Sequence, residues 1–279
     1  MIQKSYEKKE SGNLYLIPTP IGNLEDITYR AISILKSVDI VFAEDTRETI
    51  NLLKYYGITK KVESCHKYSE AMHKDKIVNI LLSGKNIGYV TDRGTPLISD
   101  PGNLIVDYAI QNNINVIALP GPNALLPAIN MSGLSNRRFL FYGFLSNKKS
   151  QLKKELIDLK DEKNTIIFYE SPFRIKDTLT IMLEIFGNRK AAIVREISKI
   201  YEEVNRNYIN NLIDYCDKIK GEIVIVVEGN NNNISNEEID INEKIKELLN
   251  KGYSRRDAIS EVADRYNINK NKIYNNYKE

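Results

Sequence analysis

Up to about Ser135 the chain alternates short runs of β-branched and apolar residues with longer amphipathic stretches. The runs, which predict buried strands, lie at residues 14–17, 40–43, 61–64, 87–91 and 116–119. The amphipathic stretches, which predict helices, lie at residues 28–37, 47–56, 71–82, 103–111 and 124–130. This alternation predicts an α/β domain over residues 12–134, in which helices cover both faces of an open sheet.

A second alternation follows and predicts a second α/β domain over residues 135–229. Its expected strands lie at residues 139–144, 165–169, 191–195 and 222–227, with helices near 151–159 and 175–186. Residues 230–236 are polar and rich in asparagine, which is typical of a linker. Residues 237–279 predict a helical module of about three short helices, with caps at Ser254 and Asn267. The polar residues 1–11 are expected to form an N-terminal extension.

Composition narrows the class of protein. With 42% hydrophobic and 28% charged residues, the chain has the content of a folded globular protein. The polar N-terminus has no apolar signal segment, and no later run is long enough to span a membrane. Cys65 and Cys216 have no ligand-like spacing, so we expect a cytoplasmic protein without a disulfide framework or a metal site. The net charge of +3 permits an anionic partner but does not indicate one.

Candidate chemistry is concentrated in the loops that follow the predicted strands, at residues 18–24, 44–47, 92–102 and 120–124. In open α/β sheets, ligands bind beyond the carboxyl ends of the strands. The loops contain neither the glycine fingerprint of dinucleotide binding nor a P-loop, which disfavours NAD and ATP. Proline and glycine make them rigid, and two of them lead into predicted helices. We therefore expect their backbone amides to hold a polar, non-phosphate cofactor near helix N-termini.

Five motifs occur together in one order: LIPTPIGNLEDIT at 16–28, AEDTR at 43–47, GTPLISDPG at 94–102, LPGPNA at 119–124 and FYESPFR at 168–174. This set resembles the signature of the small-subunit ribosomal RNA methyltransferase I family, which has the tetrapyrrole methylase fold. The resemblance covers about residues 12–229, and the tail is similar to the helical module that the family often carries. It implies two α/β domains with a cofactor cleft between them, and a homodimer. It also implies S-adenosylmethionine-dependent 2′-O-methylation of a cytidine ribose in the decoding centre of 16S ribosomal RNA.

Methyl transfer requires little covalent participation by the protein, but it requires alignment of the attacking oxygen with the methyl carbon and sulfur. By resemblance, the cofactor cradle contains Asp92, Gly94, Thr95, Pro96, Ile98, Asn123 and Ala124, with Pro18 and Tyr169 at its edge. A ribose hydroxyl also needs a proton acceptor, and Glu44, Asp45 and Glu170 are the candidates for a general base. Each has an alternative structural role, since Asp45 is placed to pair with Arg47 and Glu170 to cap the turn at Ser171.

Basic residues indicate where RNA would bind. Residues 137–154 contain no acid, and Lys148, Lys149, Lys153 and Lys154 around a predicted helix start form a candidate phosphate-binding edge. Lys251, Arg255 and Arg256 form a second candidate contact in the helical module. Asn23 offers a polar group for a nucleotide, and Arg93 is equally suited to an RNA phosphate or to a nearby acid.

Two other functions remain open at the level of the sequence. The same fold supports methylation of a small tetrapyrrole of the precorrin or uroporphyrinogen type, a substrate that needs no basic edge. A non-catalytic RNA-binding or ribosome-assembly protein that uses the cofactor fold only as a scaffold is the alternative outside the enzymes. Transfer of a labelled methyl group to RNA, to a tetrapyrrole or to neither distinguishes the three.

Overall fold

The computed structural model describes residues 2–7, 9–65, 70–230, 241–266, 270 and 273–274 of the 279-residue chain, without the side chains of Lys218 and 264–266. Contacts divide the chain into two compact units, Met1–Asn230 and Asn231–Glu279. The first unit contains two separate five-stranded sheets, and the second is helical. No helix in the described part is long and apolar enough to cross a membrane.

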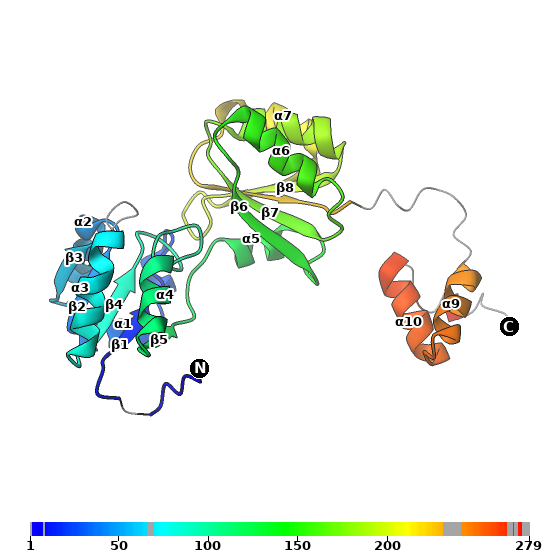
Figure 1. Ribbon diagram of the computed structural model, residues 1–279. Coiled ribbons are helices and arrows are strands. Elements are labelled where there is room, and N and C mark those ends of the chain that lie inside the picture. Colours follow the sequence, from blue (N-terminus) through cyan, green and yellow to red (C-terminus); the bar gives the residue numbers. More distant parts are fainter. Residues whose placement is uncertain are drawn as a thin grey trace. The chain divides into compact units, whose positions relative to one another are not determined.

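The first sheet is entirely parallel and has the order β3-β2-β4-β1-β5. Its strands are β1 (Asn13–Leu16), β2 (Ile40–Ala43), β3 (Lys61–Ser64), β4 (Ile87–Val90) and β5 (Asn115–Ala118). One face is covered by α1 (Tyr29–Ser37) and α2 (Thr46–Tyr55), the other by α3 (Glu70–Leu82) and α4 (Asn103–Gln111) (Figure 1). Because both faces are buried, β2 and β4 are apolar throughout, which is the pattern that made them predictable.

Side chains at the helix starts explain where the chain turns after β1 and β2. The Thr28 hydroxyl accepts a hydrogen bond from the Ala31 N–H at 3.0 Å, and Asp45 Oδ1 accepts one from the Arg47 N–H at 2.8 Å. Each bond satisfies a backbone donor that the first helical turn leaves free. The caps therefore end the loops that follow β1 and β2 and fix them at one edge of the sheet.

The second sheet is mixed and has the order β6-β7-β10-β8-β9. Its strands are β6 (Phe139–Phe144), β7 (Thr165–Glu170), β8 (Lys190–Arg195), β9 (Glu203–Tyr208) and β10 (Ile223–Val227). Only β6 and β7 are parallel neighbours. One face is covered by α6 (Lys149–Leu159), α7 (Ile175–Phe186) and α8 (Ile209–Tyr215), while α5 (Leu125–Ser132) packs on the opposite face (Figure 1).

The predicted strands and helices of both domains lie within two residues of the observed ones, but two features were not foreseen. β9 and α8 have no counterpart among the predicted elements. In addition, α5 follows β5 yet packs through Ala128 and Ile129 on the second sheet. The boundary at residues 134–135 stays a prediction, and the packing assigns α5 to the second sheet.

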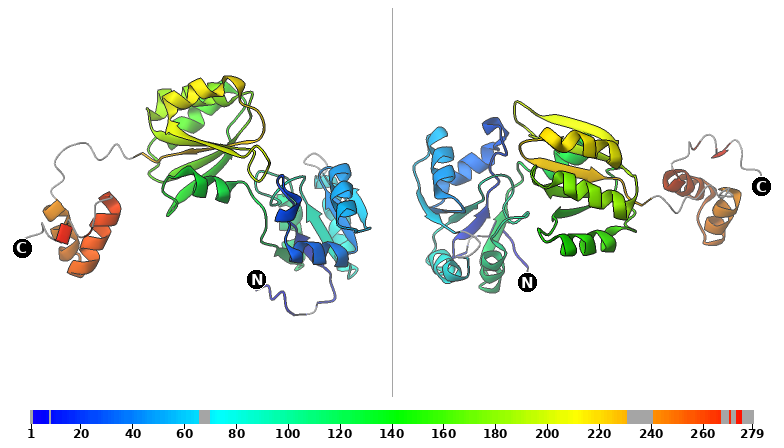
Figure 2. Two further views of the ribbon diagram at one scale, coloured as in Figure 1. Left: turned by 180° about the vertical axis from the view of Figure 1, so that it is seen from behind. Right: turned by 90° about the horizontal axis from the view of Figure 1, so that it is seen from above.

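The C-terminal unit contains α9 (Ile241–Asn250) and α10 (Arg255–Tyr266), which lie against each other in orange and red (Figure 2). Their shared core includes Ile245, Ile259 and Val262. The predicted cap at Ser254 is observed, since its hydroxyl accepts from the Asp257 N–H at 3.2 Å. The predicted cap at Asn267 and most of the third helix lie outside the described residues, as does the predicted linker beyond Asn230.

Candidate functional site

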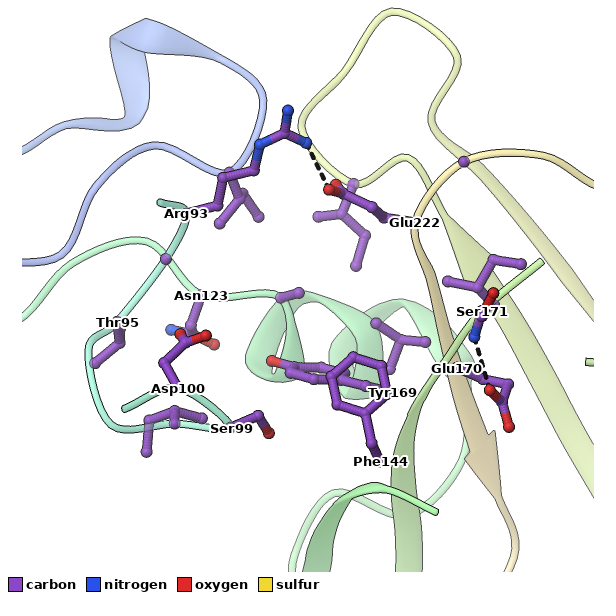
Figure 3. A pocket seen from close by; sticks show the side chains of 18 of the residues that line it. Arg93, Thr95, Ser99, Asp100, Asn123, Phe144, Tyr169, Glu170, Ser171 and Glu222 are labelled. Atoms are coloured by element: carbon purple, nitrogen blue, oxygen red, sulfur yellow. Dashed lines mark hydrogen bonds and ion pairs between the residues drawn. The ribbon is translucent and has the colours of Figure 1, made fainter. Parts of the chain in front are cut away.

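A cavity of about 390 Å³, called here the central cavity, lies where loops of the two sheets meet (Figure 3). The first sheet and the start of α5 contribute Ile21, residues 93–95 and 98–100, Asn123 and Ala124. The second sheet contributes Phe144, residues 169–172, Ile197 and residues 221–224. Its volume is in the range of small-molecule sites, and its walls are mostly apolar with a few polar groups, which is the usual composition of such sites.

One wall is formed by the loop between β4 and α4, whose backbone is strained. Leu97 and Ser99 have left-handed φ angles of 71° and 70°, and Gly94 has a φ of 84°. Two hydrogen bonds of 2.9 Å join the N–H and C=O of Gly94 to those of Thr19, which pins the loop to the end of β1. Strained residues persist only where the surroundings determine them, and they cluster at ligand sites.

Asp100 is the carboxylate that this loop brings to the cavity. Figure 3 shows it beside Asn123 and near Thr95, on the side of the cavity opposite Glu170. Burial raises the pKa of Asp100 to about 6; the neighbouring Glu44 and Asp92 carboxylates also raise it, and a hydrogen bond from Thr91 opposes them. A carboxyl group with a pKa in this range can both accept and release a proton near neutral pH. The sequence did not single out Asp100, because burial of one aspartate in a turn leaves no mark in the motif.

Aromatic side chains form the middle of the cavity. Tyr169 packs edge-to-face against Phe141 and Phe144, with ring centroids 5.0 and 5.5 Å apart. Burial raises the pKa of Tyr169 to about 12, although the backbone amides of Ala124 and Leu125 at its phenol oxygen partly oppose this. The phenol is therefore neutral near pH 7. Its oxygen accepts hydrogen bonds from the backbone amides of Ala124 and Leu125 at the start of α5.

An ion pair spans the mouth of the cavity. The guanidinium of Arg93, from the first sheet, lies 2.5 Å from the carboxylate of Glu222, which immediately precedes β10 (Figure 3). Lys199 binds the other oxygen of Glu222 at 2.7 Å. Of the two roles expected for Arg93, the structure shows the pairing with an acid, and that acid belongs to the other sheet.

Six of the predicted cofactor residues line the central cavity: Gly94, Thr95, Ile98, Asn123, Ala124 and Tyr169. Pro18 and Pro96 are buried, and Asp92 is exposed and accepts a hydrogen bond from the Asp45 N–H at 2.8 Å. These three side chains therefore do not line the cavity, although Asp92 raises the pKa of Asp100.

The expectation that backbone amides of the loop at 92–102 hold a cofactor near the start of α4 stays a prediction, but two amides within the first turn of that helix are already occupied. The buried carboxylate of Glu70 accepts hydrogen bonds from the N–H groups of Leu104 and Ile105, at 2.7 and 3.3 Å. Glu70 therefore caps α4 from a residue far away in the sequence. At α5, Asn123 Oδ1 accepts from the Leu126 N–H at 2.9 Å, so amides there are also occupied.

The three candidate bases all have structural partners. Glu170 is buried, and its two oxygens accept from the Ser171 N–H at 2.8 Å and the Thr178 hydroxyl at 2.7 Å. Figure 3 shows its carboxylate turned toward Ser171, away from the middle of the cavity. It braces the turn after β7, as the structural alternative predicted.

Asp45 and Glu44 do not line the central cavity. Hydrogen bonds from the side chain and backbone of Arg47 lower the pKa of Asp45 to about 2, which makes it a poor base near neutral pH. Glu44 accepts a bond from the Thr91 hydroxyl at 3.4 Å. Among the residues that the structure describes, no three His, Cys, Asp or Glu side chains gather as metal ligands would.

The candidate RNA contacts are distributed over three places. On α6 and its N-cap, Lys148, Lys149 and Lys154 are exposed without an ion pair in the described structure, whereas Lys153 is bound by Glu184 at 2.9 Å. Lys251, Arg255 and Arg256 are exposed in the C-terminal unit. Asn23 is also exposed, but its side chain caps a short 3₁₀ turn by accepting from the Glu25 N–H at 3.0 Å.

The sequences of several known proteins align with most of this chain. A family model for tetrapyrrole (corrin/porphyrin) methylases matches residues 13–213. The ribosomal RNA small subunit methyltransferase I of Bacillus subtilis (strain 168) is 45% identical and covers 97% of this chain and 95% of its own. The protein of the same name from Haemophilus influenzae is 39% identical and covers 95% of both chains.

Solved structures resemble the first unit. A crystal structure of diphthine synthase matches 78% of this chain and 90% of its own, with a TM-score of 0.61 and 14% identity. A crystal structure of uroporphyrin-III C-methyl transferase from Thermus thermophilus, complexed with S-adenyl homocysteine, matches 78% of this chain and 97% of its own. Its TM-score is 0.56 and its identity 16%. At these identities the two likenesses concern the fold alone.

Proposed function

Since this chain belongs to the tetrapyrrole methylase family, and within it to the ribosomal RNA small subunit methyltransferases I, we propose that it methylates small-subunit ribosomal RNA with S-adenosylmethionine as donor. The expected tetrapyrrole methylase fold is confirmed. The proposal extends to the 2′-hydroxyl of a cytidine in the decoding centre of 16S ribosomal RNA, and to a homodimer in the cytoplasm. The observation that carries it is the central cavity between the two sheets, into which Asp100 projects.

The residues of the central cavity fit S-adenosylmethionine. Its apolar surface, formed in part by Ile98, Ile197 and Val224, suits the adenine ring, while Thr95 and Asn123 offer polar groups at one wall. Among the lining residues, all of which the structure describes, Arg93 is the only cation, and Glu222 holds it at the mouth. The carboxylate of Asp100 is thus well placed to favour a positively charged ligand over a neutral one.

When bound, S-adenosylmethionine would supply an electrophilic methyl group and would leave as uncharged S-adenosylhomocysteine. Asp100 accepts the proton of the ribose hydroxyl while the oxygen–methyl bond forms, so charge and atoms balance. The loop, which hydrogen bonds between Gly94 and Thr19 hold in place, would keep the bound donor in a fixed position, and fixed orientation of the reactants is a major source of rate acceleration in such a transfer.

Locating a transferred methyl group tests the proposed function directly. The protein is incubated with methyl-labelled S-adenosylmethionine and either small ribosomal subunits or a uroporphyrinogen-type tetrapyrrole. We expect label only in the RNA, on a cytidine nucleoside methylated at its ribose, as identified by mass spectrometry. Label in the tetrapyrrole indicates the alternative enzyme, and cofactor binding without any transfer indicates a non-catalytic scaffold.

The lysines of α6 and its N-cap give a prediction about RNA affinity. Changing Lys148, Lys149 and Lys154 to glutamine should lower the slope of log affinity against log salt concentration by about 2, because each phosphate contact with single-stranded RNA contributes about 0.7. Filter binding at several salt concentrations measures it. Lys153→Gln is the matched control, since Glu184 already binds that ammonium. An unchanged slope in the triple variant shows that these lysines do not contact RNA.

The C-terminal unit gives a second prediction, because it has its own core and the central cavity lies wholly upstream of it. A chain ending at Asn230 should fold and bind S-adenosylhomocysteine with unchanged affinity by calorimetry. Its methylation of subunits should fall at least about tenfold, since RNA contacts fix the register of a substrate. Changing Lys251, Arg255 and Arg256 to glutamine in the full chain should have a similar effect. Full methylation by the shortened chain excludes a role of this unit in RNA binding.

A further inference from the structure

A second pocket, called here the side pocket, adjoins the central cavity. It has a volume of about 500 Å³ and lies between the loop after β1, the outer face of α2 and Lys199 from the second sheet. Arg93 lines both the side pocket and the central cavity. One side chain, held by Glu222, therefore stands between a mainly apolar cavity and a pocket with polar walls.

The groups along α2 in the side pocket have chemistry that suits a nucleobase. Tyr55 is 64% exposed, and its ring packs edge-to-face on Tyr56 with centroids 5.0 Å apart. The Tyr56 hydroxyl donates to the Leu24 carbonyl, which holds this pair of rings against the loop after β1. An exposed ring supported in this way offers a flat surface on which a base can stack.

Two hydrogen-bonding side chains stand near Tyr55 on the same helix. Glu48 and Asn51 are exposed and line the side pocket, and neither forms an ion pair or side-chain hydrogen bond within the described structure. A carboxylate is the natural acceptor for the exocyclic amine of cytosine, and it has no donor for the corresponding carbonyl of uracil. Glu48 is therefore a group that can select one pyrimidine over the other.

Positive charge is placed at the edge that the side pocket shares with the central cavity. Arg93 and Lys199 both bind Glu222, and Lys199 also binds Glu196 at 2.8 Å. The loop that carries Glu196 and Ser198 has left-handed φ angles of 53° and 70° at these two residues, so it too is strained. A phosphate can take the place of Glu222 on Arg93, since a guanidinium forms charge-assisted hydrogen bonds with carboxylates and with phosphates.

We propose that the side pocket receives the nucleotide to be methylated, with its base on Tyr55, its exocyclic amine at Glu48 and an adjoining phosphate at Arg93 and Lys199. The ribose then lies next to Arg93, at the boundary with the central cavity. The inference rests on the proposed function and names the substrate site for it. It also assigns Glu48 as the residue that distinguishes cytidine from uridine.

Exchange of the base tests the role of Glu48. Small subunits are assembled with RNA that has either cytidine or uridine at the position that the unaltered protein methylates. The unaltered protein should prefer cytidine, and Glu48→Gln should reduce this ratio of kcat/KM values about tenfold, because a glutamine amide can donate to the uracil carbonyl. Asp107→Asn, on the exposed side of α4, is the matched control and should leave the ratio unchanged.

Replacement of the aromatic ring is an independent test. Tyr55→Ala should raise KM for the subunit about tenfold, as expected for a lost base–aromatic stack, while Tyr55→Phe should retain a KM near that of the unaltered protein. Tyr29→Ala removes an even more exposed tyrosine outside both pockets and should change neither KM nor kcat. The affinity for S-adenosylhomocysteine, measured by calorimetry, should stay the same in all three variants.

The outcomes separate this inference from the proposed function. If the unaltered protein methylates no RNA, the proposed function is wrong and the assignment of the side pocket falls with it. If it methylates RNA and the Glu48 and Tyr55 variants keep its base preference and KM, the side pocket is not the nucleotide site. Weaker binding of S-adenosylhomocysteine by these variants also overturns the inference, since it makes the side pocket part of the cofactor site.

Discussion

Changing Asp100 to asparagine is expected to reduce the rate of methyl transfer at least about 100-fold, which is the usual contribution of a general base. Asparagine keeps the shape of the side chain but cannot accept the proton of the ribose hydroxyl. Binding of S-adenosylhomocysteine should persist, because the loop backbone around Gly94 is unchanged. Single-turnover transfer from labelled donor measures the rate, and Asp107→Asn on α4 is the matched control. A rate near that of the unaltered protein excludes Asp100 as the base.

The same residue predicts a pH dependence. Only the ionised carboxylate accepts a proton, so the rate should fall as the pH is lowered through about 6, the pKa of Asp100 in the folded protein, and should level off above it. The Asp100→Asn variant should lose this dependence.

The pH dependence of folding stability is an independent test, and it has the opposite sign to the pH dependence of the rate. Because the folded-state pKa is raised, Asp100 contributes stability at low pH that is lost as the pH rises through about 6. The variant should therefore be at least as stable as the unaltered protein at pH 7 in urea denaturation. A large loss of stability indicates a structural role for Asp100.

Changing Gly94 to valine is expected to weaken cofactor binding about 100-fold or more, since the loop backbone that lines the central cavity must shift, and about 1.4 kcal/mol of lost contact energy already costs tenfold in affinity. Gly94 has a φ of 84° and lines the central cavity, and both of its backbone groups bind Thr19. A β-branched residue is strained at that φ, so the loop must shift. Isothermal titration with S-adenosylhomocysteine measures the loss.

A second glycine with a positive φ, outside the cavity, distinguishes the effect of backbone strain from the effect of lining the site. Gly57 follows α2 with a φ of 64°, a Cβ added there would meet open space, and it does not line the central cavity. Gly57→Val should therefore lower the free energy of unfolding about as much as Gly94→Val does, by about 1–3 kcal/mol. The Gly57→Val protein should still bind the cofactor. If both variants lose cofactor binding equally, general destabilisation explains the effect and Gly94 is not specifically part of the site.

Much of the architecture was predictable from local pattern, because each element carried its own signal. The apolar runs of β2 and β4 indicated strands buried on both faces, and Thr28 and Ser254 marked helix starts that the structure confirms. By contrast, β9 has the sequence EVNRNY and lies at a sheet edge, where it pairs with β8 through its backbone. Backbone pairing leaves no apolar period in the sequence, so this strand and the helix after it were missed.

The candidate site was likewise predictable only where its features are local in the sequence. The loop motifs by themselves were enough to indicate the family, and six of the nine predicted cofactor residues line the central cavity, because short rigid loops at strand ends are local features. Residues far apart in the chain decided the rest: Glu70 occupies the amides of α4, Glu222 holds Arg93, and packing makes Asp100 a weak acid. Burial and pairing depend on which segments the fold brings together, and such proximity is created only by the tertiary structure.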